Sequence, residues 1–331
     1  MIILGIETSC DETAAAIVVD GTTILSSEVS SQVKVHHPYG GVVPELASRK
    51  HIEAIVPVVD QALTEARLTL SDIEAIAVTR GPGLVGALLV GFSFAKSLAY
   101  ALEIPWVGVN HLEGHINSVF LEPDPPSFPF VALLVSGGHT SIYYVTDHTC
   151  AEMMGQTRDD AAGEAFDKVA KMLDLGYPGG GIIDRLAQKG DPAKIRFPRS
   201  YLDKFTYDFS FSGIKSAVHR YIANHRDQYT EQIPDITAGF QEAVLEVLSY
   251  KAIRAAMDKG CDRIALVGGV AANSRLREKL ATDAGREGLR VHIPSIDLCG
   301  DNAAMIAGVG YHYLKAGIRA ELHDDVFSRS I

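Results

Sequence analysis

The sequence predicts an α/β protein whose two halves repeat the same order of strands, turns and helices. Both halves begin with an apolar strand, a turn of small and polar residues and a second strand, at residues 2–19 and again at residues 130–145. Both continue with a strand, a glycine turn and a helix, at residues 73–101 and again at residues 263–284. We therefore expect an internal duplication, with helices packed on both faces of mixed sheets.

Amphipathic segments between the repeats predict further helices. They cover residues 43–66, with a break near Pro57, residues 160–173, residues 235–258 and residues 302–316. In residues 160–173 and 235–258 apolar residues recur at helical spacing, so one face of each of these two helices is expected to be buried.

The positions of the repeats also predict the domain boundaries. We expect an N-terminal lobe over residues 1–129, completed by a C-terminal helix within residues 302–331, and a second lobe over residues 130–301. No low-complexity or proline-rich linker lies between them, so the two lobes are expected to be closely joined around a central cleft.

Composition is that of an ordinary globular protein. Of the 331 residues, 47% are hydrophobic and 21% are charged, and the chain is long enough for two cores. The four cysteines form no CxxC or CxxH pair, which argues against a disulfide framework or a structural zinc ribbon and suits a reducing cytoplasm. They are Cys10, Cys150, Cys261 and Cys299.

The sequence predicts neither secretion nor membrane insertion. The first residues lack a basic segment and reach a carboxylate at Glu7, unlike a signal peptide. The most apolar stretch, residues 84–95, is shorter than the about 20 apolar residues that a membrane-spanning helix needs. We expect a soluble cytoplasmic protein.

The net charge of −11 does not decide whether the substrate is a nucleic acid. A protein that binds nucleic acid alone usually has a basic face, because phosphate contacts supply much of the affinity. The whole chain shows no such excess of basic residues. If nucleic acid is bound, basic partner proteins are expected to help.

Two histidines four residues apart, His111 and His115, are the strongest indication of a metal site. On a helix this spacing places both imidazoles on one face, with Cβ atoms about 6 Å apart. A zinc protease needs a glutamate directly after the first histidine, whereas Leu112 stands there and Glu113 follows. Asp301, at a predicted helix start, could complete a set of two imidazoles and one carboxylate that suits Fe²⁺ or Zn²⁺, or could serve as a helix cap.

Glycine turns after strands indicate an anion site. Residues 136–139 and the pair Gly268 and Gly269 allow backbone N–H groups to approach an anion closely, and a following helix N-terminus favours negative charge. Two such turns in a duplicated frame resemble the layout of the actin, sugar-kinase and Hsp70 superfamily, in which they surround a nucleotide. That resemblance implies a two-lobed actin-like fold with a central cleft.

Nine motifs, in order along the chain, resemble those of the TsaD family, the tRNA N6-adenosine threonylcarbamoyltransferases that were formerly described as O-sialoglycoprotein endopeptidases. The resemblance covers roughly residues 2–316. The motifs are Gly5-Ile-Glu-Thr-Ser-Cys-Asp-Glu-Thr13, Gly40-Gly-Val-Val-Pro-Glu-Leu-Ala-Ser-Arg49, Gly81-Pro-Gly-Leu-Val-Gly86, Asn110-His-Leu-Glu-Gly-His115, Val135-Ser-Gly-Gly-His-Thr140, Asp159-Asp-Ala-Ala-Gly-Glu-Ala-Phe-Asp-Lys168, Tyr177-Pro-Gly-Gly180, Asp208-Phe-Ser-Phe-Ser-Gly213 and Gly268-Gly-Val-Ala-Ala-Asn273.

The resemblance implies an activity and a set of site residues. The activity is transfer of the threonylcarbamoyl group from threonylcarbamoyl-adenylate to N6 of adenosine 37 in tRNAs that read ANN codons. By position, His111, His115 and Asp301 would hold a divalent metal. The adenylate would be held by Leu134, Val135, Ser136, Gly137, Gly138, Asp167, Gly180, Asp184 and Asn273.

Proton removal from N6 needs a base, and the first turn offers two candidates. Glu12 and Asp11 are expected to lie near the bound donor, and either could assist. No protein nucleophile is expected, because the carbamoyl carbon is already activated as a mixed anhydride with AMP.

The resemblance also implies protein partners, a paralogous actin-like protein (TsaB-like) and a small P-loop ATPase (TsaE-like). The predicted helix over residues 84–101 carries one charged residue, Lys96. Such a helix is usually buried, but we also consider that it binds a partner through its small residues, Gly86, Gly91 and Ala95.

Three other functions stay open from the residues alone. A sugar kinase or ATPase on the same fold would need no histidine pair. A metalloprotease would need a glutamate beside His111. A nucleotide-binding scaffold without catalysis would not need an intact set of metal ligands.

Overall fold

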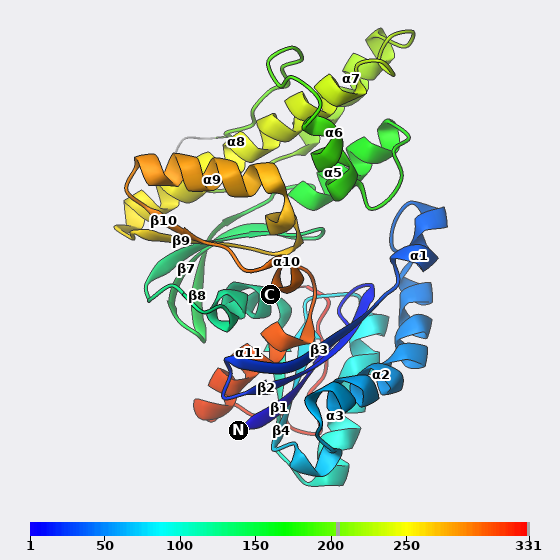
Figure 1. The fold of residues 1–331 in the computed structure, drawn as a ribbon, viewed down its shortest axis with the longest axis vertical. Helices are drawn as coiled ribbons and strands as arrows, with labels where there is room; N and C mark the ends of the chain where they lie inside the picture. Colours follow the sequence, from blue (N-terminus) through cyan, green and yellow to red (C-terminus); the bar gives the residue numbers. More distant parts are fainter. Residues whose placement is uncertain (203–205, 330–331) are drawn as a thin grey trace. The chain divides into compact units, whose positions relative to one another are not determined.

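The computed structural model describes residues 1–202 and 206–329, which fall into two compact units (Figure 1). Unit 1 consists of Met1–Pro125 and Pro294–Ile331, and unit 2 of Pro126–Ile293. Residues 294–301, which the sequence analysis assigns to the second lobe, belong to unit 1. One reason is that the Ser295 backbone N–H donates to Glu122 Oε1 at 2.7 Å, which fixes the returning chain to unit 1.

Sheet 1, in unit 1, mixes antiparallel and parallel pairing. Its strand order is β3 (Thr23–Ser31), β2 (Glu12–Val19), β1 (Ile2–Glu7), β4 (Ala75–Gly81) and β5 (Trp106–Asn110). The first three strands form an antiparallel meander, and β1, β4 and β5 are parallel. Parallel neighbours require crossover connections, which the helices supply.

Sheet 2, in unit 2, repeats this topology strand for strand. Its order is β8 (Cys150–Gln156), β7 (Thr140–Asp147), β6 (Phe130–Val135), β9 (Arg263–Val267) and β10 (Arg290–His292), again antiparallel and then parallel. The predicted duplication is therefore confirmed. The edge strand β8 has largely exposed side chains and no apolar alternation, so little in the sequence indicates it.

Alternating side chains of sheet 1 divide between two cores. Successive side chains of a strand point to opposite faces of the sheet. Those on one face contact α11 (Ala303–Lys315), and those on the other face contact α2 (Pro44–Ala66) and α3 (Val85–Leu102). In β4, for example, Ala77 faces α11 and Val78 faces α2 and α3. In Figure 1, α11 lies beside β1 and β2, although it comes from the opposite end of the chain.

The predicted break of the helix near Pro57 is wrong, since α2 runs without interruption from Pro44 to Ala66. The Pro57 ring lies on the exposed side of α2, where water can bond the carbonyl that lacks a partner. Buried neighbours on the other side, including Ile55 and Val58, hold the helix against sheet 1.

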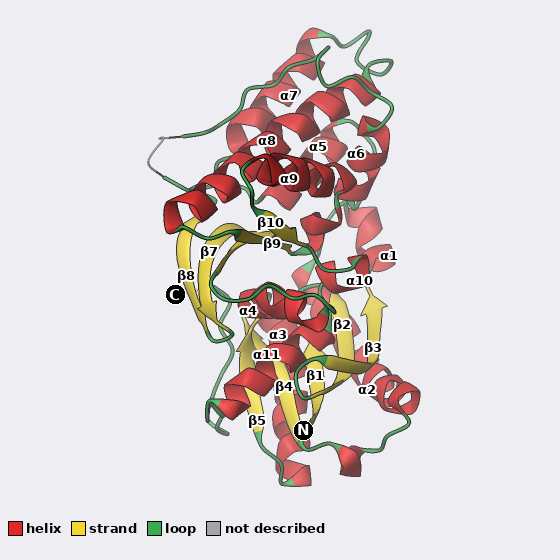
Figure 2. Ribbon diagram, turned by 60° about the vertical axis from the view of Figure 1, so that its left-hand side comes forward, coloured by secondary structure: helices red, strands yellow, loops and turns green. Residues whose placement is uncertain are grey.

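Unit 2 carries its helices on sheet 2 and on one another, as Figure 2 shows. They are α5 (Ala162–Met172), α6 (Gly179–Ala187), α7 (Ser212–Asn224), α8 (Ile233–Lys259) and α9 (Ser274–Arg286). Helix α8 is buried along most of its length and contacts three strands. The 3-10 turn η4 (Gly269–Ala272) follows the glycine pair, so α9 begins only at Ser274.

Short helical segments complete unit 1. They are α1 (Val33–His36), η1 (His37–Tyr39), η2 (Leu70–Asp72), α4 (His111–Asn117), η3 (Ser118–Leu121) and α10 (Ile296–Cys299). Helix α3 is the one helix of residues 1–202 and 206–329 that is long and apolar enough to cross a bilayer, with a mean hydropathy of 1.6. Its residues Phe92, Ala95 and Ala99 are instead buried in the core of unit 1.

Candidate metal centre and nucleotide site

The histidine pair lies on α4, which begins directly after β5. The side chain of Asn110 caps this helix by accepting the Leu112 N–H at 2.9 Å. Gly114, between the two histidines, faces α11, and a Cβ at that position would lie 2.8 Å from Ile306 Cδ1. The missing side chain therefore lets α4 pack closely on α11.

Asp301 reaches the histidines because it immediately precedes α11. Asn302 caps α11 by accepting the Met305 N–H at 2.9 Å, so the cap of this helix is Asn302 rather than Asp301. Asp301 Oδ1 lies 3.1 Å from His115 Nε2 and 3.6 Å from His111 Nε2. One ligand atom from each of the three side chains lies within 4.8 Å of the others. The predicted ligands converge.

Burial and charge at this position suit a cation. His115 is fully buried and His111 is 6% exposed, with ring centroids 4.7 Å apart. Burial and the charge of Asp301 raise the pKa values of Asp11 and Glu12, and the charge of Asp11 also contributes at Glu12, whose pKa is raised to about 8. A divalent cation would relieve this crowding of carboxylates, and two imidazoles with one carboxylate are donors that Fe²⁺ and Zn²⁺ accept. The residues fit a metal.

Glu7, at the end of β1, is part of this cluster and was missed by the sequence analysis. Its Oε2 accepts the Thr79 hydroxyl at 2.6 Å and lies 3.0 Å from His111 Nδ1, and its Oε1 accepts the Ser9 N–H. Burial opposes ionisation, but His111 and Thr79 outweigh it and hold the pKa of Glu7 below its usual value. Burial likewise opposes the charge on His111, but Glu7 and Asp301 raise the pKa of this histidine to about 9. An acid that ends a buried apolar strand is the signal that could have pointed to Glu7, because a buried carboxylate needs partners.

Glu113 points away from the histidines. It accepts a hydrogen bond from the Tyr313 hydroxyl on α11. Burial raises the pKa of Glu113, and the only resolved partner of its side chain among residues 1–202 and 206–329 is Tyr313. The arrangement that a zinc protease requires is therefore not present at Glu113.

The two candidate bases occupy the turn between β1 and β2. Glu12 Oε1 accepts the Ser31 hydroxyl at 2.9 Å, and Glu12 Oε2 is buried without a partner in the described part of the chain. Asp11 is partly exposed. Both therefore keep oxygen atoms that could accept a proton.

The predicted anion turn of unit 2 follows β6. The Ser136 N–H donates to the His139 carbonyl at 2.8 Å, and the Ser136 hydroxyl accepts the His139 N–H at 3.1 Å, which closes the turn. Gly137 and Gly138 are exposed, and a Cβ on either would meet no atom of the described chain within 4 Å. Leu134 and Val135 are fully buried within sheet 2, so only their backbone supports the turn.

The remaining predicted adenylate residues brace the starts of α6 and α9. Asp167 Oδ1 accepts the Gly179 N–H at 2.7 Å, and the Asp184 carboxylate accepts the N–H and the hydroxyl of Ser274, each at 3.1 Å. The Asn273 side chain caps α9 and donates to Gln241 at 2.8 Å. A Cβ on Gly180, at the start of α6, would meet no atom of the described residues within 4 Å. Unit 2 thus presents two helix N-termini together with an open glycine turn.

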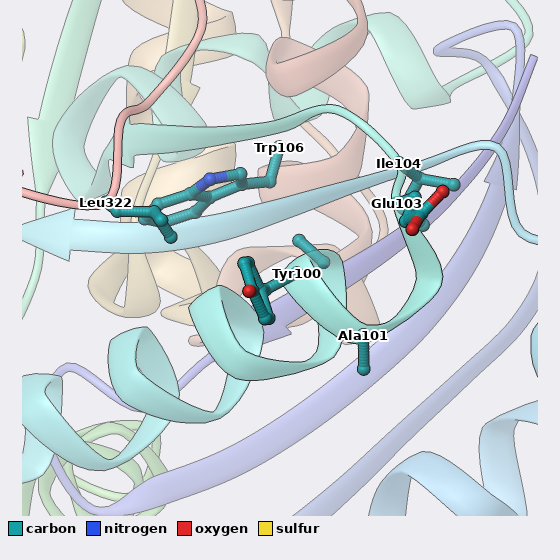
Figure 3. A pocket seen from close by; sticks show the side chains of 7 residues that line it. Tyr100, Ala101, Glu103, Ile104, Trp106 and Leu322 are labelled. Carbon is teal, nitrogen blue, oxygen red and sulfur yellow. The ribbon is translucent and has the colours of Figure 1, made fainter.

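A pocket of about 520 Å³ lies elsewhere in unit 1, at the C-terminal end of α3 (Figure 3). Trp106, Tyr100 and Leu322 form its apolar wall, with Glu103 and Ile104 at its other side. None of its lining residues belongs to the histidine cluster, so the predicted chemistry is not located here.

Comparison with known proteins identifies the family. A model of the tRNA N6-adenosine threonylcarbamoyltransferases, TsaD, matches residues 23–308. The chain belongs to the TsaD family. Proteins with this same description from Desulforapulum autotrophicum and Syntrophus aciditrophicus are 61% and 53% identical to it, over 100% and 99% of this chain and 99% and 97% of theirs. The chain is therefore a transferase that forms threonylcarbamoyladenosine in tRNA.

Solved structures confirm the fold. HypF in its phosphate- and nucleotide-bound form matches 99% of this chain and 47% of its own, with a TM-score of 0.64 and 15% identity. Component A of the Acidaminococcus fermentans (R)-2-hydroxyglutaryl-CoA dehydratase matches 95% of this chain and 99% of its own, with a TM-score of 0.56 and 16% identity. This TsaD chain has the actin-like fold that the sequence predicts.

A buried histidine fixes the turn that carries Asp11 and Glu12. His51, on α2, is fully buried; the Thr13 hydroxyl lies 2.7 Å from its Nδ1, and its Nε2 lies 3.0 Å from the Cys10 carbonyl. The carbonyl can only accept, so Nε2 carries the hydrogen and Nδ1 accepts the hydrogen of the hydroxyl. Burial lowers the pKa of His51, which keeps this neutral form.

We expect the stability that His51 contributes to be lost on acidification. Because its pKa in the folded protein lies below the unfolded value of 6.5, the unfolded chain binds more protons as the pH falls through 6.5. The difference in unfolding free energy between wild type and His51→Gln should shrink by about 1 kcal/mol from pH 7.5 to 5.5. Urea unfolding at both pH values measures it, and a difference that stays constant would contradict the neutral assignment.

Proposed function

We propose that this TsaD protein transfers the threonylcarbamoyl group of threonylcarbamoyl-adenylate to N6 of adenosine 37 in tRNAs that read ANN codons, with a divalent metal held by His111, His115 and Asp301. The observation that carries the metal site is the convergence of these three side chains within 4.8 Å, two of them almost fully buried. The metal would be Fe²⁺ or Zn²⁺, since both accept imidazole and carboxylate ligands. Because the substrate is tRNA, we propose that the protein acts in the cytoplasm.

The proposed transfer needs little covalent work from the protein. N6 attacks the carbamoyl carbon, a C–N bond forms, the C–O bond to the phosphate breaks, and AMP leaves with the electron pair. The bound cation would supply Lewis-acid stabilisation of charge on the donor oxygens. The open turn at Gly137 and Gly138 would bind the phosphate through backbone N–H groups.

The proton that N6 loses would go to Glu12 or Asp11. Burial raises the pKa of both, and a carboxylate with a raised pKa accepts a proton more readily than an ordinary one. Position 37 lies in a single-stranded loop, so the base can reach such a group at little cost in pairing.

The distribution of charge supports a division of contacts with tRNA. Unit 1 contains 20 acidic and 9 basic residues, whereas unit 2 contains 21 of each, so the net charge of −11 lies in unit 1. Because phosphate repels an acidic surface, we propose that unit 2 and a basic partner hold most of the tRNA.

We expect His111→Ala and His115→Ala each to lower threonylcarbamoyladenosine formation at least a hundredfold and to abolish one-per-chain metal binding. The assay combines the protein and its partners with threonine, bicarbonate, ATP and unmodified tRNA, and mass spectrometry detects the product. His323→Ala, an exposed histidine, serves as the control. Product formation that survives both substitutions would refute the metal role, and ATP turnover without any product would favour the ATPase or scaffold alternative.

A direct role of Asp184 in binding the adenylate can be distinguished from its structural role at the start of α9. If Asp184 binds the donor, Asp184→Ala should weaken binding of a stable adenylate analogue about 10- to 100-fold, the value of a hydrogen bond to a charged group. Ser274→Ala removes the hydroxyl that Asp184 accepts but leaves the carboxylate. Calorimetry on both variants decides, because equal losses would mean that Asp184 only braces α9.

A partner surface is proposed on α2 and α3. Two of the three small residues of α3, Gly91 and Ala95, are buried inside unit 1, and a Cβ on Gly91 would overlap Thr8 Oγ1. The expectation that a partner packs on them is therefore wrong. Gly86 is exposed, although a Cβ on it would overlap Ser48 Oγ of α2. The exposed apolar side chains are larger ones, namely Ile52, Val56, Val85 and Leu89, which are 64%, 60%, 47% and 41% exposed.

We infer that these four side chains form one surface. Gly86 and Ser48 bring the two helices together, and Ile52 and Leu89 lie about one turn further along each. A contiguous exposed apolar surface marks a protein interface. We propose that it binds the paralogous actin-like partner (TsaB-like), and that the P-loop ATPase (TsaE-like) joins that complex.

We expect Ile52→Lys combined with Leu89→Lys to weaken binding of the purified actin-like partner at least tenfold, because two charges would be buried in an apolar contact. Met257→Lys places the same charge on an apolar residue of α8 that is 55% exposed, and it should leave binding unchanged. Light scattering of mixed samples measures the complex. Equal binding by the double variant and the wild type would exclude this surface.

A further inference from the structure

We propose that Glu7 is a positioning residue of the metal centre: its buried carboxylate accepts the Nδ1 hydrogen of His111 and thereby directs His111 Nε2 at the metal. This role rests on the metal site of the proposed function. It concerns a side chain that touches neither the donor nor the tRNA, and acts through His111.

The hydrogen bonds at Glu7 determine which ring nitrogen of His111 carries hydrogen. The carboxylate accepts from the Ser9 N–H and the Thr79 hydroxyl, and its third contact is His111 Nδ1 at 3.0 Å. An ionised carboxylate has no hydrogen to give, so Nδ1 must donate. The lone pair of the neutral ring then lies on Nε2, which is the atom that faces Asp301 Oδ1 at 3.6 Å.

Glu7 itself is held rigidly. It is fully buried at the end of β1, and its neighbour Ile6 pairs with Val78 of β4, which brings Thr79 beside it. A carboxylate fixed by a strand and a hydroxyl holds its partner more precisely than one on a loop. Histidine ligands of metals commonly donate their second nitrogen to such a group, which orients the ring and raises its basicity.

The two histidines differ in this respect. His115 Nδ1 is buried without a hydrogen-bond partner in residues 1–202 and 206–329, whereas His111 Nδ1 has Glu7. We infer that His111 is the oriented ligand of the pair. A buried acid with a merely structural role would stabilise unit 1 without determining which nitrogen binds the metal.

The experiment compares Glu7→Gln with Glu113→Gln. Both substitutions remove an acid near the histidines, Glu7 fully buried and Glu113 half-buried, but Glu113 bonds Tyr313 and faces away from the metal site. The amide that replaces the Glu7 carboxylate cannot accept all three hydrogens at once, because its nitrogen only donates. We expect Glu7→Gln to weaken Zn²⁺ binding 10- to 100-fold in competition with a chelator, the range seen when such partners are lost, and Glu113→Gln to leave it within about threefold.

Ring ¹⁵N NMR of the zinc-loaded wild type tests the same point without a variant, which matters if Glu7→Gln does not fold. The proposal requires His111 to bind zinc through Nε2 and to keep hydrogen on Nδ1. Zinc on Nδ1, or equal affinity in Glu7→Gln and wild type, would overturn it. If the wild type itself bound no zinc at one per chain, the metal site of the proposed function would fail first, and the role of Glu7 with it.

Discussion

The packing of α11 across sheet 1 is the constraint on which the candidate metal centre depends. Its apolar residues share one core with side chains of β1, β2, β4 and β5, so the C-terminal helix completes the N-terminal unit. This contact places Asp301 beside His115, from which it is separated by 186 positions in the chain. Gly114 lets α4 approach α11 closely enough for the carboxylate to reach both imidazoles. Without the return of α11, the histidine pair would have no third ligand.

Most of the fold could be predicted because it depends on local pattern. Apolar runs bounded by turn residues predicted strands of sheet 1, and the repeated order of elements predicted that the second half would repeat the first, as sheet 2 does. The failures have physical causes. Strand β8 is an exposed edge without alternation, and Pro57 is tolerated because its ring faces water. The prediction that a partner contacts the small residues of α3 failed for Gly91 and Ala95, because composition does not show which side of an apolar helix is buried.

The part of the candidate site that follows from helical spacing could be predicted from the sequence. The part that depends on contacts between distant residues was missed. His111 and His115 share a face by helical periodicity alone, and the outward direction of Glu113 follows from the same periodicity. Glu7 lies 104 positions from His111, and nothing in the local sequence states that the two side chains meet. Leu134 and Val135 were predicted as contacts from their place in a motif, but their side chains lie in the core of unit 2. A sequence motif locates the turn. The structure is needed to distinguish its exposed residues, which a ligand could contact, from the buried residues that hold the turn in place.

The duplication has given the two units opposite preferences for charge at equivalent positions. In each unit the first strand leads through a turn into an antiparallel partner. In unit 1 that turn carries Asp11 and lies between Glu7, the last residue of β1, and Glu12, the first residue of β2, whereas in unit 2 it carries Gly137 and Gly138. Carboxylates on a turn attract cations and protons, and bare backbone N–H groups on a turn attract anions. The same difference extends to whole units, since unit 1 holds the entire net charge of −11 and unit 2 is neutral. In the function proposed above, the glycine turn of unit 2 would bind the phosphate of the donor, and the acidic residues of unit 1 would serve a cation and the departing proton. A duplicated fold can offer both chemistries by changing the residues of one turn.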